Sequence, residues 1–491
     1  MDDVLIIGSG FGGAMAALTL AQSGARVRLL ERGPWRDTLP LQHSAINRRV
    51  PLPQGRHFFS HVLYRVHHRW LPGGSLSLHR HGLLELFAGP AIRAVCASAV
   101  GGGSHAYGGL NARPLHHDYW DKVADGLSSA QMEPHYQRAL SLMDASQPEA
   151  RHFPPLPPLL PADNNPFVDV DGQQQPAWAY LLGERHGHSR QQDWRGFTRQ
   201  QAIFEQEGPF GSPGGGKTTL DIACLLPAIQ LGLQLQANCE VLSIRRIDNG
   251  YAVSARDSTS GRLQDYRAAK VVVAAGTLNT VRLLLNSRAQ GGIDGLPALG
   301  QGFTANADTM AWWPVNTRGA NHPAHGIYQR LLRHRDDHNG PLLLQTGIAG
   351  LHAMPLPRWL KKRLQQDLFI AAMGVDEANG RLSLKGSTLH MDYDSQQPVY
   401  RRIDQHLQTI AELSGIKPRK GKTPTTVHPM GGAVAGSKPQ QAVVNASGEV
   451  FGQPGLFVAD GSALPAATGS PPSMSIAAWA LHVADGISRR G

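Results

Sequence analysis

The segment DVLIIGSGFGGAMAALTLAQSG, residues 3–24, decides the class of fold. Its first part, Asp3–Gly8, is a short apolar run that ends in glycine and predicts a buried strand. Ala14–Ser23 carries apolar residues at helical spacing, and Ala25–Glu31 has the composition of a second strand. A strand, a tight turn, a helix and another strand open a doubly wound parallel sheet, so we expect an α/β protein.

The turn between the first strand and the helix fits the pattern G-x-G-x-x-G through Gly8, Gly10 and Gly13. The first glycine allows the tight turn, the second lets a pyrophosphate approach the backbone, and the third allows close packing of helix on strand. The N-terminus of the helix also directs its positive dipole at the phosphates. Glu31 can accept a hydrogen bond from a ribose hydroxyl and disfavours a 2′-phosphate. The pattern predicts a dinucleotide site and argues against NADP, but it leaves both FAD and NAD open.

Length and composition favour a two-domain protein. The chain has 491 residues, and its 55 glycines and 34 prolines suit a loop-rich α/β protein. It contains no apolar run of about 18 residues and no basic leader, so we expect neither a transmembrane helix nor a signal peptide. Cys96, Cys224 and Cys239 form neither a disulfide framework nor a metal-ligand pattern. They favour a reducing cytoplasm, and we expect no metal site.

The chain is basic, with 47 Lys and Arg against 37 Asp and Glu, a net charge of +10. Excess base attracts nucleic acid, anionic membranes or acidic partners. The charges are spread along the chain without an aromatic-and-basic ladder, so we expect no nucleic-acid partner. The densest stretch, HFFSHVLYRVHHRW at 57–70, has two interpretations: a peripheral membrane or lipid contact, or a partly buried cap segment.

A second motif competes with the first. The sequence GSPGGGKT at 211–218 satisfies the P-loop pattern G-x-x-x-x-G-K-S/T, which is typical of nucleotide hydrolases. A P-loop must follow a buried strand, however, and EQEGPF at 205–210 is polar and broken by proline. A loop that leads into a helix over 219–231 is the favoured interpretation.

Later segments extend the predicted nucleotide fold. Leu233–Arg245 and Tyr251–Arg256 are typical of a hairpin, and Lys270–Ala275 predicts another buried strand that ends at Gly276. A helix is expected around 133–146, and the proline-rich stretch 153–167 is expected to form a loop or linker. The strand GLFVADG at 455–461 is followed by PPSM at 471–474 and a helical pattern, whose N-terminus would favour an anion.

Several of these segments, in this order, resemble the glucose-methanol-choline (GMC) oxidoreductases and their bacterial cholesterol oxidase-like branch. The similar stretches are LIIGSGFGGAMAA at 5–17, AVGGGSHAYGGLNARP at 99–114, KTTLDIACLLPAI at 217–229, NCEVLSI at 238–244, VVVAAGTLNTVRLL at 271–284, HPMGGAVAG at 428–436, and VADGSALP at 458–465 through to SPPSMSIAAWAL. The resemblance implies a Rossmann-like FAD-binding domain and a discontinuous substrate-binding domain built on an antiparallel sheet. The expected FAD-binding parts are 1–40, 85–118, 215–305 and 425–491, and the substrate-binding or cap parts are 41–84, 119–214 and 306–424.

The resemblance also implies non-covalent FAD, because His105 stands one position before the place where some relatives attach the cofactor. The residues expected to hold FAD are Gly8, Gly10, Phe11, Gly12, Gly13, Glu31, Gly101, Gly102, Gly103, Ser104, Tyr107, Gly108, Val241, Ala275, Gly276, Asp460, Gly461, Pro472 and Met474.

The same resemblance places His428, in HPMGG, at the active-site histidine of an enzyme that oxidises the hydroxyl group of a bulky, apolar or cyclic alcohol. Histidine suits this proton transfer because imidazole titrates near neutral pH, while flavin N5 would take the hydride. The family pairs this histidine with Asn or His, but the matching residue here is Pro471, so Ser470, Ser473 or His105 would have to substitute.

Three functions follow from the sequence. The first is an FAD-dependent alcohol dehydrogenase or oxidase that passes electrons to O2 or another carrier. The second is a tailoring enzyme or lyase of the GMC fold without net alcohol oxidation, which Pro471 favours. The third and most remote is a P-loop nucleotide hydrolase.

Overall fold

The computed structural model describes residues 1–149, 152, 160–170, 175–183, 189–204, 206–316 and 330–489. The chain opens with β1 (Asp2–Ile7), α1 (Phe11–Gln22) and β2 (Val27–Leu30), so the predicted strand, turn, helix and strand are confirmed. Every residue of α1 from Phe11 to Ala21 is buried, which explains why its sequence is almost wholly apolar or small.

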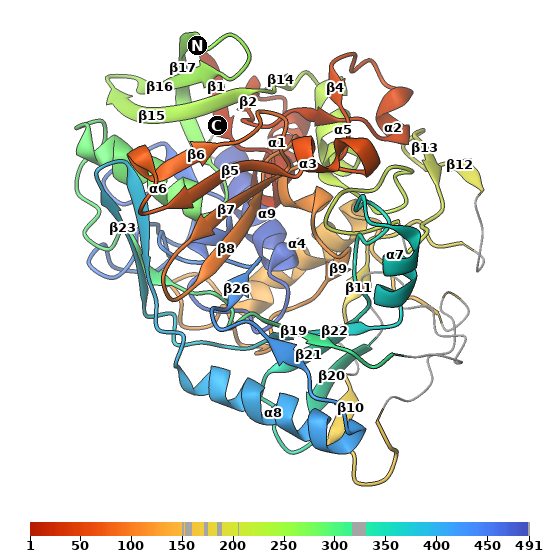
Figure 1. Ribbon diagram of the computed structural model, residues 1–491. Helices are drawn as coiled ribbons and strands as arrows, with labels where there is room; N and C mark the ends of the chain where they lie inside the picture. The colour runs from red at the N-terminus through yellow and green to blue at the C-terminus, as the bar shows by residue number, and fades with distance from the viewer. Residues whose placement is uncertain are drawn as a thin grey trace.

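These strands belong to a seven-stranded sheet in the upper part of Figure 1. Its parallel part has the order β14 (Gln234–Gln236), β2, β1, β17 (Leu263–Val273) and β27 (Leu456–Val458). The antiparallel strands β16 (Gly250–Asp257) and β15 (Cys239–Ile247) extend it beyond β17. The ends of β1, β2, β17 and β27 therefore lie at one edge, where ligands bind in doubly wound sheets.

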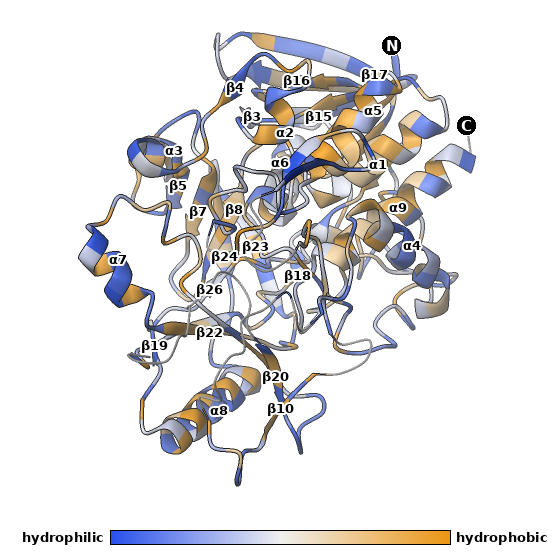
Figure 2. Ribbon diagram, turned by 90° about the vertical axis from the view of Figure 1, so that its right-hand side faces the viewer, coloured by the Kyte–Doolittle hydropathy of each residue, from blue (hydrophilic) through white to orange (hydrophobic). Residues whose placement is uncertain are grey.

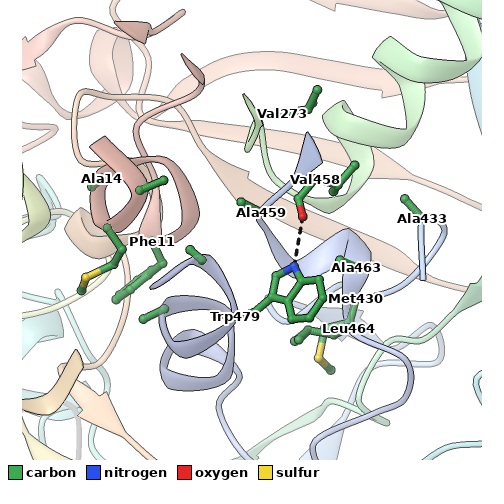
Figure 3. Packing of buried hydrophobic residues seen from close by; sticks show 14 of the residues in the cluster. Phe11, Ala14, Val273, Met430, Ala433, Val458, Ala459, Ala463, Leu464 and Trp479 are labelled. Carbon is green, nitrogen blue, oxygen red and sulfur yellow. Dashed lines mark hydrogen bonds between the residues drawn. The ribbon is translucent and has the colours of Figure 1, made fainter. Parts of the chain in front are cut away.

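Helices from both ends of the chain cover this sheet together. The last helix, α9 (Ser473–Arg489), packs along α1 and α4 (Ser129–Leu142). Its Trp479 indole donates a hydrogen bond to the Val458 carbonyl, 3.0 Å away, beside Ala459 (Figure 3). Trp479 also stacks on Trp120, with ring centroids 5.6 Å apart. The last strand and last helix are thus fixed against the first helix.

A second, six-stranded sheet is antiparallel throughout. Its order is β10 (Phe167–Asp169), β20 (Arg330–His334), β21 (Leu342–Thr346), β22 (Leu368–Met373), β19 (Thr309–Trp313) and β25 (Arg419–Lys420). The amphipathic helix α8 (Pro398–Ser414) lies beside it in the lower part of Figures 1 and 2. This sheet confirms the expected combination of a nucleotide-binding sheet with an antiparallel one, while the proposed domain boundaries stay a prediction.

A third sheet links the expected cap region to the C-terminal part. Its order is β26 (Thr425–Thr426), β8 (Arg93–Ala97), β7 (Leu84–Ala88), β5 (Leu63–His68) and β6 (Ser75–Ser77). The region 41–84, which the resemblance assigns to the cap, therefore contains regular strands. β26 pairs in parallel with β8, which holds the segment just before His428 in place.

Element boundaries differ from those expected in four places. The predicted helix over 219–231 is divided into a π-helical turn, Asp221–Leu225, and α5 (Leu226–Gln230). The start of the predicted first hairpin strand forms β14, which pairs with β2 instead. Helix α4 begins at Ser129 because the Ser128 side chain caps it by accepting the Gln131 N–H. In the proline-rich stretch, 153–159 lie outside the described residues and Phe167 begins β10. Within the described parts of the chain, no helix is long and apolar enough to span a membrane.

We expect Gly12→Ala to lower the free energy of unfolding by about 3–5 kcal/mol. A Cβ at this position in α1 would lie 1.8 Å from the carbonyl oxygen of Ala459, so either helix or strand must move. Gly486→Ala in α9 is the matched control. Its Cβ would meet open space, so this substitution should raise the free energy of unfolding by about 0.5–1 kcal/mol. Urea unfolding followed by circular dichroism measures both. Equal effects of the two substitutions would contradict this account of the packing.

Candidate functional site

An elongated cavity of about 750 Å³ runs from the glycine turn after β1 to the region of His428. Most residues predicted to hold a cofactor line it: Gly8, Gly10, Phe11, Gly12, Glu31, Gly102, Gly103, Tyr107, Gly108, Val241, Ala275, Gly276, Asp460, Gly461 and Pro472. Gly13, Gly101, Ser104 and Met474 are outside the lining.

The glycine turn leaves room for a ligand at its centre. A Cβ on Gly10 would meet nothing within 4 Å, whereas one on Gly13 would lie 1.9 Å from the Gly8 carbonyl oxygen. Glu31 is held at the rim by the Ser9 N–H and hydroxyl, 2.9 and 2.7 Å from Oε2, and by the Gly33 N–H, 2.6 Å from Oε1. Burial raises the pKa of Glu31, and these hydrogen bonds oppose that rise. An open glycine beside an oriented acid fits the ADP half of FAD.

The glycine-rich segment 101–108 forms the neighbouring wall. Gly101 has a φ of +93°, and Ser104 fixes the turn by donating its hydroxyl to the Gly101 carbonyl at 2.7 Å. The same hydroxyl accepts the Leu220 N–H at 3.0 Å. Gly102 and Gly103 can therefore face the cavity with their backbone while Ser104 anchors them from behind.

Asp460 joins two strand ends at the cavity. One oxygen accepts the Gly276 N–H at 2.8 Å and the Thr280 hydroxyl at 2.5 Å. The other accepts the Ser462 N–H at 2.9 Å. Burial raises the pKa of Asp460, and hydrogen bonds to its carboxylate counter this effect. Because β17 and β27 are parallel neighbours, their carboxyl ends meet here, and α9 starts at the same edge.

His428 is paired with Asp308, a residue that sequence reasoning missed. Its Nδ1 lies 3.0 and 2.9 Å from the two carboxylate oxygens. Asp308 also accepts the Thr426 hydroxyl at 2.8 Å and the Val427 N–H at 3.0 Å, so the segment 426–428 bonds to both of its oxygens. No described residue hydrogen-bonds to Nε2 of His428. Since the residue lines the cavity, this arrangement presents an oriented imidazole to a bound molecule.

The expected substitutes for the partner at Pro471 are placed differently from one another. Ser470 is buried outside the cavity lining, and its hydroxyl donates to the Arg113 carbonyl at 2.6 Å. His105 is also buried outside the lining, and its Nε2 is hydrogen-bonded to the Val100 carbonyl oxygen at 2.8 Å. Ser473 does line the cavity, and its hydroxyl lies 3.3 Å from the Leu110 carbonyl. Of the three, only Ser473 is placed to reach a substrate.

The antiparallel sheet contributes Thr309 and Thr346 to the wall near His428, and the other side chains that it supplies are apolar. The apolar part of the wall includes side chains from three strands of the antiparallel sheet and from the segments around them: Leu110, Met310, Leu344, Ala371, Met373 and Val427. Tyr107 lines the cavity too, but its hydroxyl donates to the Thr218 carbonyl at 2.8 Å. Apolar surface with a single oriented imidazole suits a hydrophobic molecule that carries few polar groups.

The P-loop interpretation is wrong. Lys217 is fully buried and its ammonium donates to the carbonyls of His105, Tyr107 and Gly208 at 3.0, 2.8 and 2.9 Å. A P-loop lysine must instead reach phosphate. Burial lowers the pKa of Lys217 and raises that of the neighbouring Glu207. The lysine therefore ties the glycine-rich segment 101–108 to the loop at 208.

Two family models and several curated proteins are similar to this chain. Residues 378–480 match the GMC oxidoreductase family model, and residues 3–38 match an FAD binding domain. Cholesterol oxidase of Mycobacterium tuberculosis is 25% identical over 98% of this chain and 90% of its own. The 2-methyl-1,2-propanediol dehydrogenase of Mycolicibacterium austroafricanum is 26% identical over 99% of this chain and 95% of its own.

Solved structures share the fold. A pyridoxine 4-oxidase from "Mesorbium loti" superposes with a TM-score of 0.59 at 16% identity, covering 99% of both chains. A fungal aryl-alcohol oxidase gives 0.58 at 14% identity, covering 100% of this chain and 99% of its own.

We expect Lys217→Met to lower the free energy of unfolding by about 3–5 kcal/mol, because it removes the ammonium that donates to three carbonyls and offsets the charge of the buried Glu207. Lys438→Met, at an exposed position, should change it by less than about 0.5 kcal/mol. Thermal unfolding of the two variants measures the difference. A loss at residue 217 no larger than that at 438 would contradict the assigned role of the ammonium.

Proposed function

Because this chain is a GMC oxidoreductase with an FAD-binding domain, we propose that it oxidises the hydroxyl group of a bulky, apolar or cyclic alcohol. The observation that carries the proposal is the His428–Asp308 pair at the apolar part of the cavity. The similar proteins named as cholesterol oxidase and 2-methyl-1,2-propanediol dehydrogenase support it. FAD would accept the hydride, and O2 or another carrier would then reoxidise it.

The proposed FAD site begins at Gly8, Gly10 and Glu31 and continues along the lining to Asp460 and Gly461. Among the described residues of that lining, His428 is the single histidine, and Cys96 is the single cysteine. Burial raises the pKa of the Cys96 thiol to about 12, so it is a poor nucleophile. Both features support non-covalent binding. The three free cysteines agree with a cytoplasmic location, which is part of the proposal.

His428 would take the hydroxyl proton of the alcohol at Nε2. Asp308 accepts a hydrogen bond from Nδ1–H, which selects the required tautomer and keeps the ring in one orientation. The carboxylate would also stabilise the imidazolium formed after proton transfer. Asp308 is therefore proposed as the positioning partner of His428, and Ser473 as an additional hydrogen-bonding group.

The alternative is a tailoring enzyme or lyase with this fold and no net alcohol oxidation. Pro471 supports it, because proline lines the cavity where a second polar side chain would help to hold an alcohol oxygen. The two functions differ in one property: only alcohol oxidation requires the bound flavin to be reduced by the substrate.

We expect purified protein to show the absorbance of oxidised flavin, and candidate secondary alcohols to bleach that band anaerobically. Suitable probes are cyclohexanol, 1-phenylethanol and a 3-hydroxysteroid carried by cyclodextrin. Bleaching by dithionite but by no alcohol would contradict alcohol oxidation and favour the alternative. Oxygen consumption during turnover would separate an oxidase from a dehydrogenase.

With an alcohol that bleaches the flavin, we expect His428→Ala to slow reduction by about 10²–10⁴-fold without loss of FAD. Asp308→Asn should slow it by at least about 10-fold, because Asn can present its N–H₂ to Nδ1 and select the wrong tautomer. The control is His117→Ala at an exposed position, which should leave the rate unchanged. A normal rate of flavin reduction in the His428→Ala variant would show that this histidine takes no part in the reaction.

We also propose that one side of the molecule contacts anionic lipid. In the stretch 57–70, Phe59 and Trp70 are 79% and 78% exposed, while Tyr64 is buried. The helix α7 (Arg358–Leu364), RWLKKRL, adds four basic residues and Trp359, which is 71% exposed. Helices α3 (Phe58–His61) and α7 lie on the same side of the molecule in Figure 2. Exposed aromatic rings beside basic side chains suit a membrane interface.

We expect the protein to float with vesicles containing phosphatidylglycerol, and less so in high salt, because part of the attraction is electrostatic. The triple variant Phe59→Ser, Trp70→Ser, Trp359→Ser should lose most of this binding. Trp194→Ser, which removes a tryptophan that is 73% exposed, is the matched control and should keep it. Equal binding of the wild type and the triple variant would contradict the proposed contact.

A further inference from the structure

The turn that delivers Asp308 to His428 is conformationally strained. Asn306 and Ala307 precede Asp308 and have φ angles of +56° and +45°. Two consecutive non-glycine residues in the left-handed region are rare, and alanine has no polar side chain that could compensate locally. Both residues are fully buried. Such a conformation persists only where the surrounding structure holds it.

A buried carboxylate holds this turn from behind. Asp376 accepts the N–H groups of Ala305 and Ala307 on one oxygen, at 3.0 and 3.4 Å. The Tyr393 hydroxyl donates to the same oxygen at 2.7 Å, and the Ala378 N–H donates to the other at 3.1 Å. Asp376 is buried, so these donors replace the water that its carboxylate would otherwise bind. Its side chain is outside the lining of the cavity.

The turn reaches both segments on the reacting side of the cavity. Asp308 bonds to His428. The Asn306 side chain accepts the Gly469 N–H at 2.8 Å and donates to the Ser470 carbonyl at 3.1 Å, immediately before Pro471. One strained turn therefore sets the position of the imidazole and of the chain that leads into α9.

We propose that Asp376 is a positioning residue of the active site, which acts through the turn 305–308 on His428 and on the segment 469–471. Its carboxylate keeps Ala305 and Ala307 in the conformation from which Asp308 and Asn306 reach their partners. The effect on turnover rests on the proposed alcohol oxidation, but the coupling between the turn and the two segments does not.

The test uses Asp376→Asn in the holoenzyme, with hydrogen–deuterium exchange measured by mass spectrometry. Asparagine removes the negative charge that these donors face, and its N–H₂ must lie either against the Ala378 N–H or against the three donors to the other oxygen. We expect faster exchange in peptides that cover 303–309, 425–430 and 468–471, and unchanged exchange in the distant hairpin β15–β16. Tyr393→Phe, which removes only one donor to Asp376, should give a smaller change in the same peptides.

A second substitution distinguishes strain from general damage. Ala307→Gly removes the Cβ that disfavours a positive φ, so it should restore slow exchange to the Asp376→Asn variant. Lys122→Gly replaces an exposed residue with a φ of +68° on another loop. This control substitution should not restore slow exchange to the Asp376→Asn variant. With an alcohol that bleaches the flavin, Asp376→Asn should lower the rate of reduction at saturation at least tenfold, and Ala307→Gly should recover most of it.

Exchange that rises throughout the protein, or recovery with neither or both glycine substitutions, would overturn the proposal. So would an Asp376→Asn variant with normal exchange at all three segments. If the exchange pattern is as expected but no alcohol reduces wild-type flavin, the positioning role stands and alcohol oxidation fails.

Discussion

The structure depends on the close approach of the first helix to the end of the last strand. Gly12 leaves no space for a side chain between α1 and the Ala459 carbonyl, so the two ends of the chain meet at one sheet edge. Asp460 follows directly, and its carboxylate joins the end of β27 to the turn after β17 through Gly276. Without that contact, the glycine turn after β1 and the start of α9 would not face the same cavity.

A second constraint is electrostatic and acts on the other part of the cavity. Asp308 receives hydrogen bonds from Thr426, Val427 and His428, three consecutive positions. The strand β26 fixes this segment against β8, and the turn 305–308 fixes the carboxylate. The backbone on both sides of the His428–Asp308 pair therefore keeps the imidazole in one orientation.

Local patterns in the sequence predicted the nucleotide-binding half well, because Gly8, Gly10 and Glu31 belong to one strand–turn–helix–strand unit whose geometry follows from spacing. Asp308 could not be found in this way. It lies 120 residues from His428, and no spacing rule connects them. The hydroxyl direction of Ser470 was equally hidden, because it depends on the distant Arg113 carbonyl. The P-loop pattern is the opposite case. Its glycines and Lys217 match the motif, but the lysine donates hydrogen bonds inside the core instead of reaching a phosphate.

Pro471 has a physical role that is consistent with oxidation despite its missing side-chain donor. Pro471 and Pro472 lack N–H groups, so the first backbone donors of α9 come from Ser473 onward, next to the cavity. Free donors at a helix N-terminus favour negative charge on a bound group. The segment before the prolines is held by Asn306 through the backbone of Gly469 and Ser470. The chain thus fixes this part of the wall by backbone contacts, and the proposed role of His428 in proton transfer does not depend on a side-chain donor at position 471.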